Sequence, residues 1–324
     1  MSRVQAGGRL LATLIAAGML VPAAAAAKPA KPGVTTGGAA DIAQSTVTLK
    51  GSVDPNERAT QYFFEYGTTS LYGASTPPGD AGKGTRRVAV TAAVAGLAPA
   101  TRYHYRLVAR NARGLTKGKD RTFKTKRQPL GLSLVATPNP VGPNGTSVLS
   151  GNLSGTGNAN RQVVLQSNPF PYTQGFQNAS NPHVTDASGN FAFPVLNIGL
   201  NTQYRVLMPQ NPTVQSPIVA VGVAPKVSAG KHRVRRTARG AIYRFRGKIT
   251  PAADGTQVAI QRLRNGTWRT ISGTVARHTG SGYSRYSKRV RLARGGRFRV
   301  YAGVNNGQYV PSTSRTLRVK LKRR

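Results

Sequence analysis

Apolar and polar residues alternate over most short segments of this chain, and Gly or Pro residues separate the segments. The clearest case is Leu97–Asn111, where Tyr103, Tyr105 and Leu107 alternate with basic side chains and a histidine. A period of two is typical of a strand with one buried and one solvent-exposed face. A turn containing Pro99 precedes the first tyrosine, and this arrangement predicts the tyrosine corner of a β-sandwich.

The same alternation predicts further strands on either side of this stretch, each bounded by turn residues. Several short strands within about 85 residues predict a β-sandwich over residues 41–127. The strands are expected at Thr46–Val53, Gln61–Gly67, Val88–Val94 and Asp120–Thr125, with a loop at Thr68–Asp80 and a turn at Asn111–Gly118.

Two motifs in this region carry a family resemblance. L-x-P-x-T-x-Y-x-Y-x-L at Leu97–Leu107, with N-x-x-G at Asn111–Gly114, resembles a fibronectin type III domain. F-F-E-Y-G-T-T-x-x-Y-G at Phe63–Gly73 is similar to variants of that domain in exported actinobacterial proteins. The resemblance implies the sandwich fold, and for function it implies a spacer or a binding module, because such domains serve as both.

The chain beyond Arg127 contains an internal repeat with an offset of 94 to 96 residues. Gln162–Gln166 matches Gln257–Gln261, and Tyr204–Val206 matches Phe298–Val300. Two copies in the same order predict the same β-domain twice, at residues 128–224 and 225–324. Q-R-x-x-N-G-x-W at Gln261–Trp268 resembles bacterial Ig-like repeats of exported surface proteins, and this resemblance implies a mostly structural role.

The chain is strongly basic, because its 324 residues hold 47 Lys and Arg against 8 Asp and Glu, a net charge of +39. Residues 226–324 alone hold 26 Lys and Arg and one acid, Asp254. Such a field attracts polyanions and weakens with salt. Strand alternation places a set of these cations on solvent-exposed faces, and we predict that they bind an anionic surface: Arg244, Arg246, Lys248, Arg289, Arg291, Arg297, Arg299, Arg318 and Lys320.

The N-terminus has the composition of a targeting segment. Arg3 and Arg9 precede the apolar run Leu10–Val21, and small residues follow to Ala27. A basic start, a short apolar centre and an A-x-A end predict a secretory signal peptide over residues 1–27, with an uncleaved anchor as the alternative. Residues 28–40 are rich in Pro and Gly and are predicted to be a flexible linker.

Residue types that support catalysis are scarce. The chain has no cysteine, and its four histidines do not have metal-ligand spacing. Paired carboxylates are needed for general acid–base catalysis, but most of the eight acids adjoin turn residues. No nucleophile elbow, phosphate-binding loop or dinucleotide fingerprint is present. We therefore expect no enzymatic activity, no cofactor and no metal site.

Together these patterns predict an all-β protein with three β-sandwiches in tandem after a signal peptide. The expected function is a secreted or cell-wall-associated binding and scaffold module, whose basic last domain attaches to an anionic wall polymer or polysaccharide. A structural spacer, a protein-binding adhesin arm and an accessory module of a glycan-acting system are the alternatives. An arginine-rich composition without a specific partner is a further interpretation, and specific nucleic-acid recognition or a membrane span after cleavage is not expected.

Overall fold

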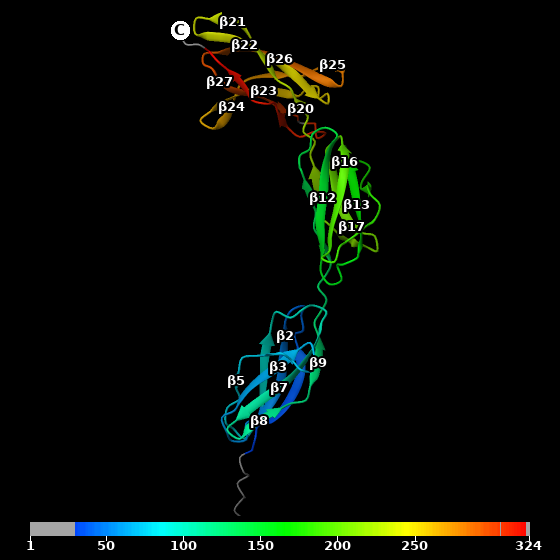
Figure 1. The fold of residues 1–324 in the computed structure, drawn as a ribbon, viewed down its shortest axis with the longest axis vertical. Helices are drawn as coiled ribbons and strands as arrows, with labels where there is room; N and C mark the ends of the chain where they lie inside the picture. Colours follow the sequence, from blue (N-terminus) through cyan, green and yellow to red (C-terminus); the bar gives the residue numbers. More distant parts are fainter. Residues whose placement is uncertain (1–29, 305, 322–324) are drawn as a thin grey trace, which may run out of the picture. The chain divides into compact units, whose positions relative to one another are not determined.

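The computed structural model describes residues 30–304 and 306–321. Within these residues the chain consists of β-strands and connecting segments, without a helix, so the predicted all-β class is confirmed (Figure 1). The predicted signal peptide lies outside the described residues. The chain divides into two compact units between Lys126 and Arg127.

Two antiparallel sheets form the first sandwich. One has the strand order β1-β2-β6, and the other has the order β4-β3-β7-β8, with β5 also paired to β3 and β9 to β7. A three-stranded sheet against a sheet built on two long central strands is a β-sandwich, which confirms the fold that the resemblance implied. The strands are β1 (Gly33–Ala40), β2 (Val47–Asp54), β3 (Gln61–Gly67), β4 (Ala74–Ser75), β5 (Gly79–Asp80), β6 (Val88–Val94), β7 (Arg102–Asn111), β8 (Gly114–Lys117) and β9 (Arg121–Lys124).

The predicted linker is wrong over its last eight residues, because Gly33–Ala40 is the edge strand β1, paired with β2. Gly37 serves close packing here, because a Cβ on it would lie 2.7 Å from the carbonyl oxygen of Lys50. Thr36 is buried, and its hydroxyl accepts the N–H of Leu107 at 3.1 Å. A glycine in a strand can allow two backbones to approach closely, and composition alone does not distinguish this role from that of a linker glycine. The predicted loop and turn were also incomplete, since they contain β4, β5 and β8.

The tyrosine corner is present at the start of β7. The Tyr103 hydroxyl accepts the backbone N–H of Ala98 at 2.9 Å, and the ring stacks on Phe123 at a centroid distance of 5.5 Å. Both rings are buried beside Tyr105 and Leu107. The corner therefore ties the segment before β7 to the core.

Replacing Tyr103 with Phe is expected to lower the free energy of unfolding of the first sandwich by about 1 to 2 kcal/mol, because the Ala98 N–H loses its acceptor. Urea unfolding measures the effect. Tyr66→Phe is the matched control, because no hydrogen bond from the Tyr66 hydroxyl exists among the described residues, and it should change stability by less than about 0.5 kcal/mol. Equal effects of the two substitutions would contradict this account of the corner.

The second sandwich repeats the arrangement of the first. β12 is central in one sheet, flanked by β10, β11 and β16, and β13 and β17 are central in the other. Its core includes Leu149, Leu153, Leu165 and Val206, all nearly fully buried. The strands are β10 (Gly131–Leu132), β11 (Val135–Thr137), β12 (Gly145–Ser154), β13 (Gln162–Pro169), β14 (Gln177–Asn178), β15 (His183–Val184), β16 (Asn190–Ile198), β17 (Thr202–Met208), β18 (Asn211–Gln215) and β19 (Val219–Val221).

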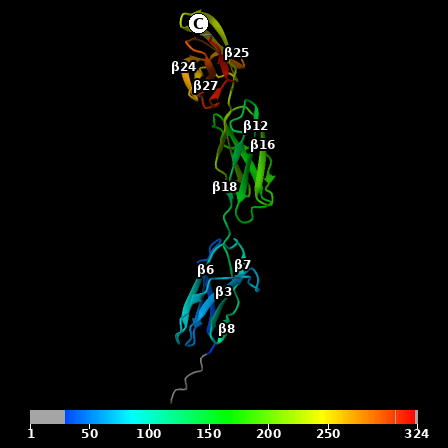
Figure 2. The same ribbon diagram turned by 60° about the vertical axis from the view of Figure 1, so that its left-hand side comes forward.

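The third sandwich has one sheet of order β20-β22-β26-β25, with β21 paired to β22, and a second sheet of order β24-β23-β27-β28, with β29 paired to β27. Figures 1 and 2 show β25 and β24 in different layers of this sandwich. The strands are β20 (Lys226–Val227), β21 (Gly230–Thr237), β22 (Gly240–Thr250), β23 (Gln257–Arg264), β24 (Thr267–Val275), β25 (Arg277–Ser281), β26 (Tyr283–Leu292), β27 (Gly296–Gly303), β28 (Ser312–Thr313) and β29 (Leu317–Val319).

The second and third sandwiches have similar close glycine contacts at equivalent positions of the predicted repeat. A Cβ on Gly151 would lie 2.0 Å from the Ser133 carbonyl oxygen, and one on Gly247 would lie 1.9 Å from the Ser228 carbonyl oxygen. Each glycine therefore lets the segment that follows the first short strand, β10 or β20, pass close to the long strand β12 or β22. The two copies belong to one compact unit, and a hydrogen bond of 2.8 Å from the Asn201 side chain to the carbonyl of Gly307 joins them.

Candidate anion-binding surface

Alternation in β22 separates the core of the third sandwich from its charged surface. Tyr243, Phe245 and Ile249 are buried, and Phe245 contacts Phe298 of the opposite sheet at a centroid distance of 5.6 Å. The residues between them therefore lie on the outer face of the sheet. Arg246 is exposed, and the three predicted cations of this strand, Arg244, Arg246 and Lys248, share that face.

The register of the neighbouring strands extends this surface. In the β22–β26 pair, Arg244 lies opposite Arg289, and Lys248 lies opposite Arg285. Neighbouring strands are about 4.8 Å apart, so each pair brings two cations together across the sheet. Strands β20, β21 and β25 add one outward cation each. We call this surface the first basic face: Lys226, Arg235, Arg244, Arg246, Lys248, Arg277, Arg285, Arg289 and Arg291.

Sequence reasoning missed four members of the first basic face: Lys226, Arg235, Arg277 and Arg285. Strand β21 has no alternating pattern, because nearly all of its side chains are exposed, and a bulge shifts its register between Arg233 and Arg235. Strand β25 is likewise irregular in its pairing with β26. For Lys226, Arg235 and Arg277, only the pairing with β22 and β26 assigns a face, whereas Arg285 lies on β26, whose burial alternates.

One aromatic ring lies among these cations. The Lys248 ammonium is 3.9 Å from the centroid of the Tyr283 ring, and the Arg285 guanidinium carbon is 5.4 Å from it. Arg285 also donates a hydrogen bond of 2.9 Å to the Tyr283 hydroxyl. Cation–π attraction of this kind positions two of the charges at the end of the face nearest the β25–β26 connection.

The remaining four predicted residues lie on the other sheet. Arg297 and Arg299 are on β27, Arg318 is on β29 opposite Arg297, and exposed Lys320 follows that strand. Because Phe298 points into the core, its neighbours point away from the first basic face. The structure thus divides the nine predicted cations between two opposite surfaces, and we call Arg297, Arg299, Arg318 and Lys320 the second basic face.

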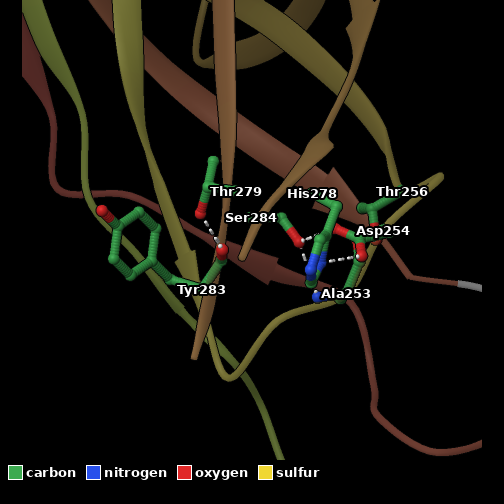
Figure 3. A network of polar contacts seen from close by, with 7 residues as sticks. All are labelled: Ala253, Asp254, Thr256, His278, Thr279, Tyr283 and Ser284. Carbon is green, nitrogen blue, oxygen red and sulfur yellow. Dashed lines mark hydrogen bonds and ion pairs between the residues drawn. The ribbon is translucent and has the colours of Figure 1, made fainter. Parts of the chain in front are cut away.

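The single acid of residues 225–324, Asp254, forms hydrogen bonds within its own sandwich. Asp254 accepts hydrogen bonds from the Ser284 hydroxyl and, through its other oxygen, from His278 at 2.7 Å (Figure 3). The Ser284 hydroxyl, fully buried, also accepts the N–H of Ala253 at 2.9 Å. Serine and histidine bind different carboxylate oxygens rather than each other, so this is not the geometry of a nucleophile with its base. The network connects the loop after β22 to β25 and β26.

The Asp254 network predicts a pH dependence of stability. The hydrogen bond from Ser284, and then the contacts with His278, lower the pKa of Asp254 below its ordinary value of 3.8. A lowered folded-state pKa contributes stability above the ordinary value, and this contribution disappears as the pH falls through the lowered value. Asp254→Asn should therefore melt at a lower temperature than the parent at neutral pH. The difference in melting temperature between the variant and the parent should narrow below about pH 4. Thermal melts at several pH values measure it. A constant difference would contradict this explanation.

The described residues contain no group of three or more His, Asp or Glu side chains that could bind a metal ion. They also contain no helix with the length and apolarity needed to cross a bilayer.

No protein-family model and no curated protein matches the chain. The FN1–FN3 domains of chicken CNTN1 are 16% identical, with 91% of this chain and 99% of that chain covered and a TM-score of 0.31. Titin domains are 14% identical, with 90% and 99% covered and a TM-score of 0.34. A tetra-tandem repeat from the extending region of a large adhesion protein is 13% identical, with 89% and 75% covered and a TM-score of 0.31.

Proposed function

We propose that this chain is an exported, non-enzymatic scaffold module that attaches to an anionic polymer through the first basic face of its third sandwich. The observation that carries the proposal is the cross-strand pairing within that face, where cations of β22 lie directly opposite cations of β26. Like charges directly opposite each other on a sheet are destabilising. A polyanion would relieve this repulsion, and an acidic partner within the domain is missing because Asp254 binds His278 and Ser284.

The geometry favours a polymer over a small anion. Outward residues on one strand are about 6.8 Å apart and neighbouring strands about 4.8 Å apart, so the cations form a two-dimensional array. A small anion contacts two or three of these groups, whereas an extended polyanion contacts many at once and releases its counterions. An acidic polysaccharide or a phosphate-containing wall polymer has the required repeated charge.

Export and the scaffold role have separate support. The predicted signal peptide over residues 1–27 supports export. The distribution of charge supports a division of labour: residues 128–224 contain only Arg161, Arg205 and Asp186 as charged residues besides one histidine. We propose that this nearly uncharged second sandwich acts as the structural spacer and that the third sandwich provides attachment.

Binding of the whole chain to immobilised heparin over a salt series tests the proposal. Strong retention at 50 mM salt and a steep loss by 200 mM are expected, because the interaction depends on counterion release. Isolated wall polymer and a neutral polysaccharide serve as the second ligand and the negative control. Absent binding to both anionic ligands, or binding that does not change with salt, would overturn the proposal and favour the spacer or protein-binding arm.

A further inference from the structure

Arg299, on the second basic face, is held in one orientation. Its Nε donates a hydrogen bond of 2.8 Å to the Gln261 side-chain oxygen, and its guanidinium carbon lies 4.6 Å from the centre of the Trp268 ring. Gln261 on β23 is the register partner of Arg299 on β27. All three side chains are partly buried. A guanidinium fixed at Nε and stacked on an indole loses little entropy when its remaining donors bind a ligand.

A trio of this kind, made of an arginine, its side-chain hydrogen-bond acceptor and an aromatic ring, occurs in each sandwich. In the second sandwich, the Nε of Arg205 donates to Gln166 at 2.9 Å, and its guanidinium lies 4.3 Å from the centre of the Phe176 ring. As in the third sandwich, the arginine and its acceptor are register partners in the two central strands of their sheet. A repeated arrangement of this kind has a shared structural role, in which the arginine attaches an aromatic side chain to the sheet.

The first sandwich has a charged version of the trio. Arg106 donates to Glu65 at 2.6 Å and lies 4.4 Å from the centre of the Tyr72 ring. Glu65 and Arg106 are again register partners. Here the carboxylate compensates the charge of the guanidinium, so this trio has no surplus charge for an anionic ligand.

The three trios differ in what remains available for a ligand. Arg205 has a second internal acceptor, since its Nη1 donates to Gln215 at 3.0 Å. Among the described residues, the terminal nitrogens of Arg299 have no hydrogen-bond acceptor, and its acceptor Gln261 is neutral. Arg297 lies two residues away on the same face, opposite Arg318, and adds positive charge. Only the third trio therefore combines an oriented guanidinium, open donors and surplus charge.

We propose that Arg299, oriented by Gln261 and Trp268, forms an oxyanion site on the second basic face. Its two terminal nitrogens bind one carboxylate, sulfate or phosphate group through paired charge-assisted hydrogen bonds. The site is separate from the first basic face, because the two lie on opposite sheets of the sandwich. The third sandwich thus binds anionic groups on both of its surfaces.

The position of Trp268 provides a direct readout, because it is the only tryptophan of the chain. Titration of the whole chain with inorganic sulfate, phosphate or acetate at constant ionic strength should change Trp268 fluorescence saturably. The strongest of the three responses identifies the oxyanion class. A response that is absent for all three ions would overturn the proposal.

Matched substitutions separate binding from structure. Gln261→Glu keeps the hydrogen-bond acceptor and should keep the melting temperature, but it compensates the charge as Glu65 does and should weaken the apparent affinity by about tenfold or more. Gln166→Glu makes the same change in the second sandwich and should leave the response intact. Equal responses of the two variants would overturn the proposal.

Two further variants complete the design. Arg299→Met keeps an apolar side chain on Trp268 without donors, and it should abolish the response even where Gln261→Glu folds poorly. Replacing Arg244, Arg246, Arg289 and Arg291 with Gln alters the first basic face alone and should leave the Trp268 response in place. Retention of the response in Arg299→Met would contradict the site, whichever result the heparin experiment gives for the proposed function.

Discussion

Replacement of Arg244, Arg246, Arg289 and Arg291 with Gln is expected to weaken binding of the whole chain to heparin by about 10²-fold or more at low salt. A Lys or Arg near a densely charged anionic surface contributes about 1 kcal/mol, so four of them account for an effect of this size. All four lie on the outer face of the β22–β26 pair and point away from the core. Folding should therefore persist, and thermal melts check that it does.

The matched control removes four cations from elsewhere in the chain. The control residues are exposed positions of the first sandwich: Arg102, Arg110, Arg113 and Lys117. Both variants reduce the net charge by four. The control should lose less than about threefold in affinity, because its cations do not belong to the β22–β26 array. Comparable losses in the two variants would mean that net charge alone, rather than the array, determines binding.

Phe298→Ala is expected to lower the free energy of unfolding of the third sandwich by about 3 to 5 kcal/mol, the range for truncating a buried phenylalanine. Phe298 is fully buried and contacts Phe245 across the two sheets, so the substitution leaves a cavity between them. The same contact directs the two basic faces to opposite sides. Urea unfolding followed by Trp268 fluorescence measures the loss.

Val275→Ala is the control for this substitution, because Val275 lies on the edge strand β24 and is 40% exposed. It should change stability by less than about 0.5 kcal/mol. A loss of below about 1 kcal/mol in Phe298→Ala would show that the core between the two sheets tolerates a cavity. The packing that separates the two basic faces would then need another explanation.

Much of the fold could be predicted from side-chain alternation. Strand β3 and strand β6 have the bounds that the pattern indicated, and Tyr103 forms the expected corner with Ala98. The linker prediction was wrong at Gly33–Ala40, because the glycines there were taken as a sign of a flexible chain. Gly37 lies where two backbones approach closely, and this approach depends on the tertiary contact between β1 and β2.

For part of the candidate surface the outward direction of a side chain could be predicted, but the face to which it belongs could not. Alternation correctly placed Arg244 and Arg299 outside the core, yet a period of two cannot say which sheet of a sandwich a strand joins. The pairing of β27 with β23, rather than with β22, separates Arg299 from Arg244. The Arg299 trio was invisible for the same reason, since Gln261 and Trp268 acquire their roles only through cross-strand register and side-chain stacking.

The salt dependence of polyanion binding is a direct test of attachment through the first basic face. The slope of log affinity against log salt reports how many cations engage the polymer, at about 0.7 to 0.9 for each contact with a phosphate polymer. We expect the slope of the Arg244, Arg246, Arg289 and Arg291 variant to be shallower than that of the parent by about 3. The slope of the first-sandwich control should stay within about 1 of the parent. Equal changes of slope in the two variants would contradict attachment through the first basic face.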